Sequence, residues 1–152
     1  MLNGHIEGLK EVPSHKQVQQ ALVDMQDKDK DFVGSNQWIG AFEVSLAINY
    51  YTDGFDCKIL NVTQGSLLSE QGPTLKEHFL THGTPVMIGG DVYAHTILGV
   101  DVPNDDAEVI DETKAKVMFL ILDPHYKGAD TNLKQILTKG WCAWKDPSKF
   151  FN

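Results

Sequence analysis

Two side chains suited to acid–base chemistry, Asp123 and His125, lie either side of Pro124 at the end of an apolar run. Side chains at positions i and i+2 of an extended chain share a face about 6.5 Å apart, and a bend at the proline brings carboxylate and imidazole into contact. A carboxylate that orients an imidazole forms a general base, and a nucleophile beside it would complete a hydrolytic site. Spacing alone favours a simpler alternative, a structural Asp–His hydrogen bond at a strand end.

Neither cysteine of the chain is an evident nucleophile for this pair. Cys57 lies among apolar residues of a predicted strand, and Cys142 lies between Trp141 and an Ala-Trp dipeptide. A reactive thiol needs a helix amino terminus or a cationic neighbour to lower its pKa, whereas an unpaired cysteine is most often a buried residue. Both cysteines are therefore predicted to be buried and structural. Without a nucleophile, covalent catalysis falls by roughly 10³- to 10⁶-fold.

Histidine spacing also raises the hypothesis of a metallohydrolase. His78 and His82 are four residues apart on a predicted helix and could share a metal ion with His95 or His125 as a third ligand. A zinc-protease helix carries a glutamate directly after its first histidine, but here Phe79 occupies that position. A solvated histidine pair is the favoured interpretation, and the sequence predicts neither a metal nor another cofactor.

Four further residues are candidates for contact with a peptide substrate. Gly89 and Gly90 would let an extended peptide tail approach the backbone, although a plain hairpin turn accounts for them equally. Trp38 could line a groove, yet aromatic residues at helical spacing are usually core residues. His95 lies on an apolar strand, a position more typical of a core histidine than of a ligand or an acid.

Composition limits the class of protein. The 152 residues are 41% hydrophobic and 22% charged, as in an ordinary soluble domain, and no boundary or repeat divides them. A formal net charge of −8 argues against a nucleic-acid or anionic-membrane partner. Two cysteines are too few for a disulfide scaffold, and the chain shows neither a signal peptide nor a stretch of transmembrane length. We therefore expect a cytoplasmic protein.

Helical periodicity predicts four helices around the chemical residues. The first starts at Ser14, where Gln17 completes a capping box, and ends at the DKDKD run. The second is expected to be substantially buried because Trp38, Ile39 and Phe42 begin an apolar face. Glycines with positive φ are expected to end three of these helices. The remaining predicted bounds are 34–54, 74–82 ending at Gly83, and 132–139 ending at Gly140.

Strand patterns predict a mostly antiparallel sheet that ends at Asp123. The apolar run 116–122 is typical of a buried central strand. Two strands around Gly89-Gly90-Asp91 are expected to pair as a hairpin. Helices followed by such a sheet indicate α+β architecture. The other predicted segments are strands 57–62, 86–88, 93–100 and 141–144, a loop from 63 to 73, and an acidic surface loop from 101 to 112.

Several segments in one order resemble the catalytic domain of the ubiquitin-fold-modifier-specific proteases. The similarity covers about Pro13 to Lys145, and the segments are FVGSNQWIGAFEV, TQGS, GTPVMIGG, AHTILGV, FLILDPHY and GWCAWK. Members of that family are papain-like thiol peptidases that mature the modifier precursor and remove the modifier from conjugates. The resemblance implies a papain-like cysteine protease fold, with a mostly antiparallel central sheet and flanking helices.

The resemblance also implies roles for individual residues. It assigns His125 as the general base and Asp123 as its orienting partner. The family's nucleophilic cysteine opens a helix in a Trp-Gly-Cys-type segment ahead of the region that begins here at Pro13, and a preceding tyrosine helps to form the oxyanion hole. Residues 1–12 contain no Cys, Trp or Tyr. We therefore expect residues 1–12 to be a loose entry segment and residues 13–152 to be a peptidase domain, truncated at its amino terminus and without its Cys helix.

Two functions remain open at this point. The chain is either part of an active modifier protease, inactive by itself because the nucleophile is absent, or a non-catalytic relative, a pseudoenzyme that binds the modifier and its conjugates. In both cases the expected partners are the ubiquitin-fold modifier and its conjugates. Neither nucleic acid nor membrane insertion is expected.

Overall fold

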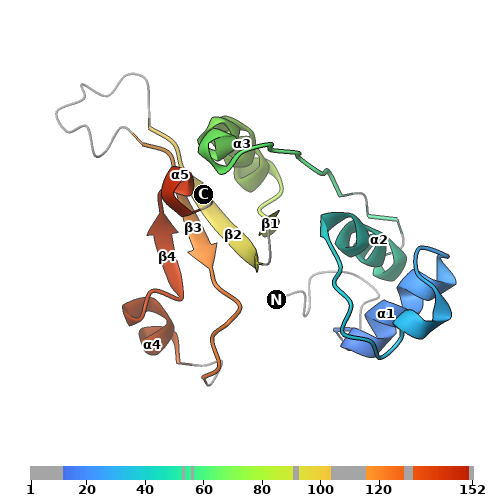
Figure 1. The fold of residues 1–152 in the computed structure, drawn as a ribbon. Coiled ribbons are helices and arrows are strands. Elements are labelled where there is room, and N and C mark those ends of the chain that lie inside the picture. Colours follow the sequence, from blue (N-terminus) through green and yellow to red (C-terminus); the bar gives the residue numbers. More distant parts are fainter. Residues whose placement is uncertain are drawn as a thin grey trace. The chain divides into compact units, whose positions relative to one another are not determined.

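The computed structural model describes residues 12–52, 54–55, 57–90, 93–103, 116–128 and 132–150. The chain divides into two compact units, Met1–Leu60 and Asn61–Asn152 (Figure 1). Most of the predicted entry segment and of the acidic loop lies outside the described residues. The prediction of one peptidase domain from residue 13 onward stays a prediction.

Helix α1, His15–Asp24, opens the first unit and begins where the sequence predicts. The Ser14 hydroxyl accepts the Gln17 backbone N–H at 3.4 Å, and the Gln17 side chain accepts the Ser14 N–H at 2.8 Å. The capping box is therefore confirmed. Leu22 on this helix is fully buried, as is Phe32 in the short 3-10 helix η1, Lys30–Phe32.

Helix α2, Ala41–Tyr51, is less buried than predicted. Only Ala47 is buried on this helix, whereas Phe42 is 59% exposed and Trp38, which precedes the helix, is 71% exposed. The prediction of a substantially buried helix is wrong because α1 covers one stripe of α2, while apolar side chains surround the helix on several sides. Gly54, with φ +96°, follows the end of the helix as expected.

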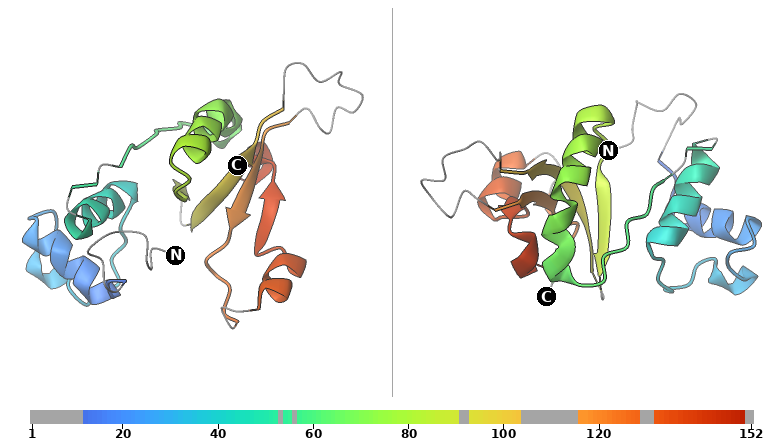
Figure 2. Two further views of the ribbon diagram at one scale, coloured as in Figure 1. Left: turned by 180° about the vertical axis from the view of Figure 1, so that it is seen from behind. Right: turned by 90° about the horizontal axis from the view of Figure 1, so that it is seen from above.

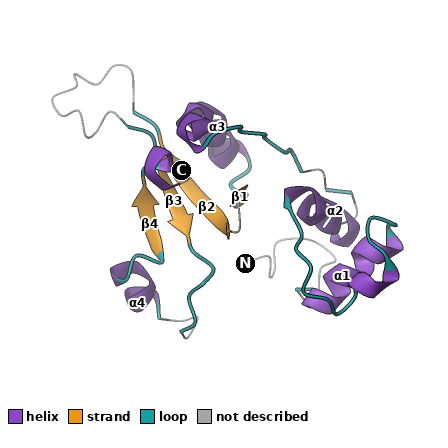
Figure 3. Cartoon of the chain, viewed as in Figure 1, coloured by secondary structure: helices purple, strands orange, loops and turns teal. Residues whose placement is uncertain are grey.

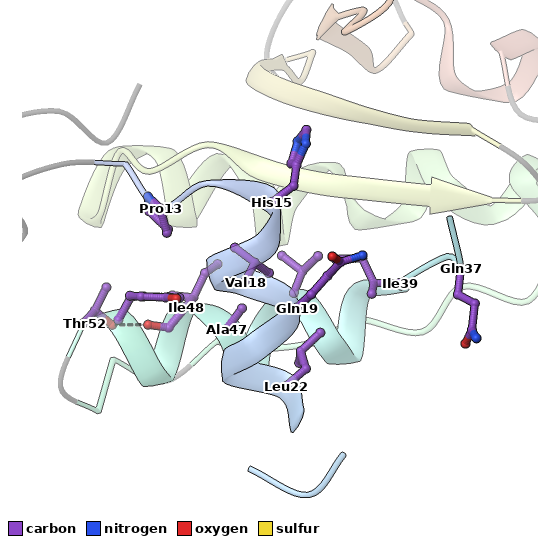
Figure 4. A pocket seen from close by; sticks show the side chains of 12 residues that line it. Pro13, His15, Val18, Gln19, Leu22, Gln37, Ile39, Ala47, Ile48 and Thr52 are labelled. Carbon is purple, nitrogen blue, oxygen red and sulfur yellow. Dashed lines mark hydrogen bonds between the residues drawn. The ribbon is translucent and has the colours of Figure 1, made fainter. Parts of the chain in front are cut away.

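An apolar groove of about 500 Å³ runs along α1 and α2 within the first unit. Figure 4 shows Val18 and Leu22 of α1 beside Ala47 and Ile48 of α2. Among its lining residues, only His15 and Tyr51 have side chains of acid–base type. The groove is thus an apolar surface without a set of acid and base groups.

The chain passes from the first unit to the second through an extended segment, residues 57–62, that is not a strand. Ile59 and Leu60 are about 40% exposed, at 41% and 38%, and residues 57–62 have no strand partner in the described structure. The strand prediction for this segment is wrong because its apolar residues signal extended chain without specifying a neighbour that could pair with it. Val62 instead packs against the core of the second unit.

Two helical elements follow. The 3-10 helix η2, Gly65–Gln71, occupies most of the segment predicted to be a loop. The loop prediction is wrong for these residues because Leu68 packs in the core, where it is only 7% exposed. Helix α3, Gly72–Thr81, comes directly after it. Gly83 has φ +67°, so the predicted glycine stop is confirmed.

Four antiparallel strands form one sheet in the order β1-β2-β3-β4 (Figure 3). The predicted hairpin is confirmed, but Gly89 and Gly90 pair with β2 within strand β1 rather than forming the turn. The short helices α4, Leu133–Thr138, and α5, Pro147–Phe150, flank β4 in sequence, and α5 was not predicted. The strand bounds are Val86–Gly90, Tyr93–Asp101, Met118–Leu122 and Cys142–Lys145.

The core of the second unit lies between one face of the sheet and α3 (Figure 2). Phe119 and Ile121 of β3 and Ile97 of β2 are at most 2% exposed, and they pack with Leu68 and Leu75. β3 alternates between buried and half-buried residues, so it has one core face. The α+β class and the central position of β3 are confirmed. No helix in the described residues is long and apolar enough to cross a membrane.

Candidate active site

A backbone hydrogen bond fixes Asp123 at the carboxyl end of the central strand β3. Its N–H donates to the carbonyl oxygen of Trp141 at 2.8 Å, which extends the pairing of β3 with β4 one residue past Leu122. Because side chains alternate along a strand, Asp123 continues the core face of Ile121. The carboxylate is thus placed at the end of the buried face of the sheet.

The carboxylate of Asp123 holds His125 through two hydrogen bonds. The backbone N–H of His125 donates to Asp123 Oδ1 at 2.9 Å, closing a tight turn at Pro124. The ring nitrogen Nδ1 of His125 lies 2.7 Å from the same oxygen, and it must be the donor because an ionised carboxylate only accepts. This tautomer leaves Nε2 as the basic nitrogen of a ring whose side chain is 52% exposed.

The turn that follows His125 is tied down by a second set of contacts. The hydroxyl of Tyr126 donates to the Gln135 side chain at 3.2 Å, and the same ring lies against Gly128. Asn132 caps α4 by accepting the backbone N–H of Gln135 at 3.0 Å. These contacts connect the Asp-Pro-His turn to α4, so both ends of the turn are anchored.

A third titratable side chain, His95, faces the same carboxylate. Nε2 of His95 lies 3.9 Å from Asp123 Oδ2, and the His95 and His125 ring centroids are 6.2 Å apart. β2 and β3 shift register between Ile97 and Gly99, where Leu98 is the extra residue of a bulge. The pair Thr96 and Leu122 beyond the bulge then sets His95 opposite Asp123.

Burial and pairing shift the acidities of these groups. Burial of His95, which is 8% exposed, lowers its pKa, although the Asp123 carboxylate opposes this effect. Burial by itself would raise the pKa of Asp123, but hydrogen bonds from the His125 backbone and ring outweigh it, and the pKa is lowered. Near neutral pH the site therefore holds an ionised carboxylate and a neutral His95.

His95, Asp123 and His125 also form a set of metal-ligating side chains. Each offers one ligand atom, and these atoms lie within 4.8 Å of one another. In the part of the chain that the structure describes, no other group of three His, Cys, Asp or Glu side chains is this close. His78, proposed from sequence as a ligand beside His82, instead lies with its Nε2 2.8 Å from the Thr84 carbonyl oxygen.

The remaining sequence candidates lie at different places. Gly89 and Gly90 are in β1, where the neighbouring Ile88 pairs with His95, so they belong to the same sheet as the site. Trp38 lies in the other compact unit. Their role in substrate binding stays a prediction.

Neither Cys57 nor Cys142 forms a disulfide in the described structure, and both are half-buried rather than fully buried as predicted. Cys57 lies in the extended segment and Cys142 on edge strand β4, where fewer neighbouring residues are available than in the centre of the sheet. Cys142 pairs with Leu122 and so faces the side of the sheet opposite to Asp123. The register therefore points this thiol away from the Asp–His pair.

The comparisons with known proteins agree on one family. The model of peptidase family C78 matches residues 2–152. The chain belongs to peptidase family C78. It is 53% identical over 141 residues to Ufm1-specific protease 2 of Rattus norvegicus, and 54% identical over 136 residues to Ufm1-specific protease 2 of Gallus gallus. It is 47% identical over 152 residues to Ufm1-specific protease of Caenorhabditis elegans.

These matches cover most of this C78 chain but a small part of each relative. They span 93%, 90% and 100% of the chain, and 28%, 27% and 24% of the respective relatives. The chain thus spans about a quarter of the length of the curated relatives it matches. The sequence-based assignment to the modifier-specific protease family is confirmed.

Proposed function

We propose that this chain carries the Asp–His half of a thiol-peptidase site that acts on a ubiquitin-fold modifier. The observation that carries the proposal is the 2.7 Å contact between His125 Nδ1 and Asp123 Oδ1 at the exit of the central strand, in a chain of peptidase family C78. The contact orients an imidazole and selects its tautomer, which are the two requirements of a general base.

Each residue of the pair has a defined part in the proposed chemistry. Nε2 of His125 takes the proton of an attacking thiol and later returns it to the leaving amine. The Asp123 carboxylate stabilises the imidazolium formed in between, and its own lowered pKa keeps it ionised. The two anchored ends of the turn fix the backbone of His125, and the hydrogen bond to Asp123 orients the ring, so little reorganisation is needed as the proton moves.

The proposed substrates are a modifier precursor and modifier conjugates. Relatives with 47–54% identity are called Ufm1-specific proteases, so Ufm1 is the modifier to test first. Recognition of a folded modifier uses surface spread over the domain rather than the reacting atom, so binding should survive without a nucleophile. A cytoplasmic location and the absence of a nucleic-acid partner complete this proposal.

Cleavage of a modifier precursor tests the proposal. The purified chain by itself should give no turnover, because the strand register points Cys142 away from the Asp–His pair and Cys57 is predicted from sequence to be structural. A chimera with the Cys-bearing segment of a relative joined in front of Pro13 should cleave the carboxyl-terminal extension of the precursor. Turnover by the chain alone that disappears in Cys57→Ala or Cys142→Ala would contradict this assignment.

A non-catalytic modifier-binding module is the second candidate, favoured by the strand register that points Cys142 away from His125. Calorimetric titration with the modifier separates the two candidates when it is combined with the chimera. Binding at concentrations below about 100 μM with an inactive chimera supports a binding module. Binding with an active chimera supports the protease.

A further inference from the structure

We infer that His95, Asp123 and His125 bind a divalent transition-metal ion, with Zn²⁺ as the first candidate. Two imidazoles and one carboxylate form a three-ligand set of the kind that holds zinc with one open position. His95 comes from β2, and Asp123 and His125 come from the turn that follows the neighbouring strand β3, so one end of the sheet presents all three side chains.

The distances are close to those that a tetrahedral ion requires. Zinc-to-ligand bonds of about 2.0–2.2 Å place the ligand atoms roughly 3.4 Å apart. His95 Nε2 is 3.9 Å from Asp123 Oδ2, and His125 Nδ1 is 2.7 Å from Asp123 Oδ1. All three ligand atoms lie within 4.8 Å of one another, so shifts of about 1 Å complete the geometry.

The three side chains differ in the freedom to make that shift. His95 is buried on β2 and Asp123 is anchored by its backbone bond to Trp141, so these two supply a rigid pair. The His125 side chain is 52% exposed and can rotate toward them. Binding would exchange the Asp123–His125 ring hydrogen bond for two metal bonds, and the remaining bond from the His125 backbone would keep the carboxylate oriented.

Metal binding would compete with the base function of His125. His125 Nδ1 can bind zinc only after it gives up its proton, so the neutral ring then carries its proton on Nε2. Nε2 can no longer accept a proton from a thiol, and the ion would inhibit the peptidase chemistry reversibly. This consequence rests on the proposed function, whereas the binding itself rests only on the geometry of the three side chains.

Zinc titration of the chain as it stands tests the inference without a peptidase assay. Calorimetry with ZnCl₂ should show one ion per chain, and affinity should fall at least about tenfold in His95→Gln and in His125→Gln. His82→Gln is the matched control, because His82 and His78 form a second histidine pair with ring centroids 5.6 Å apart. This control should change the affinity by less than about twofold.

A spectroscopic measurement on the unmodified chain keeps the inference testable if a variant fails to fold. Histidine ring NMR signals of His95 and His125 should shift together at one equivalent of Zn²⁺, and EDTA should reverse the change. The inference is overturned if no binding tighter than about 1 mM is found, if the signals of His78 and His82 shift instead, or if His82→Gln removes binding that His95→Gln leaves intact.

Discussion

Substitution of Asp123 should destabilise the second unit by an amount that depends on whether the new side chain can still accept a hydrogen bond. The carboxylate accepts the His125 backbone N–H at 2.9 Å and the ring N–H at 2.7 Å. A hydrogen bond to a charged group contributes about 1.5–3 kcal/mol, and a neutral one about 0.5–1.5 kcal/mol.

The two bonds do not contribute equally. The His125 side chain is 52% exposed, so water competes for its ring and the ring contact adds at most about 1 kcal/mol. Asp123→Ala should therefore cost about 1.5–3 kcal/mol, mainly from the backbone bond. Asp123→Asn keeps an oxygen that can accept the same N–H, so it should cost about 1–1.5 kcal/mol.

The cost should also depend on pH. The pKa of Asp123 is lower in the folded state than its ordinary value of 3.8. The stability that the ionised carboxylate contributes is therefore fully present above pH 3.8 and is lost as pH falls through the folded-state pKa. Urea unfolding of the three proteins at pH 7, followed by circular dichroism, measures the cost, and a ¹³C NMR titration of the Asp123 carboxyl carbon checks the pKa. An Asp123→Ala cost below about 0.5 kcal/mol, or a carboxyl that titrates above 3.8, would refute the reasoning.

Two further predictions concern the burial of His95 and the packing of Gly72. Burial lowers the pKa of His95 below 6.5, so the unfolded chain binds more protons than the folded chain, and stability should fall as pH drops from 6.5 toward the folded pKa. Between pH 7.5 and 5.5 the melting temperature should therefore decrease less in His95→Gln than in the unsubstituted chain. Equal decreases in the two proteins would argue against this prediction. Gly72→Ala should cost about 1–3 kcal/mol, because the added Cβ lies 2.9 Å from a Val117 methyl group and this outweighs a helix-propensity gain of about 1 kcal/mol. Gly99→Ala is the control, because the nearest atom to its added Cβ, in Trp144, lies at an ordinary contact distance of 3.7 Å. Urea unfolding should show that this substitution changes the free energy of unfolding by less than about 1 kcal/mol. Equal losses of stability in Gly72→Ala and Gly99→Ala would contradict the packing argument.

Local signals in the sequence predicted the parts of the fold that depend on neighbouring residues. The Ser14–Gln17 capping box, the stops at Gly83 and Gly140, and the Asp-Pro-His turn each involve residues at most four apart. Each has a local physical cause: unpaired backbone N–H groups at a helix start, a glycine with positive φ, or a bend at proline. These causes act between residues that are close in sequence. Sequence patterns are reliable there because no distant partner is required.

Features that depend on distant partners were not predictable. Residues 57–62 have the composition of a strand but no neighbouring strand, and the exposed face of α2 reflects how little of it α1 covers. The contact between His95 and Asp123 depends on the β-bulge at Leu98, and the sequence around Leu98 contains no pattern that predicts a bulge. The alternating pattern of β2 could have suggested that His95 shares the face of Ile97, but not which residue of β3 it faces.

The central claim is that His125, oriented by Asp123, serves as the base of a thiol peptidase. Its most direct test is the rate of precursor cleavage by the Cys-bearing chimera compared with the same protein carrying His125→Ala, with His78→Ala as the matched histidine control. We expect His125→Ala to lower kcat by at least about 10³-fold, and His78→Ala to leave it within about twofold. A rate that is unchanged by His125→Ala would contradict the claim and make the Asp–His pair structural.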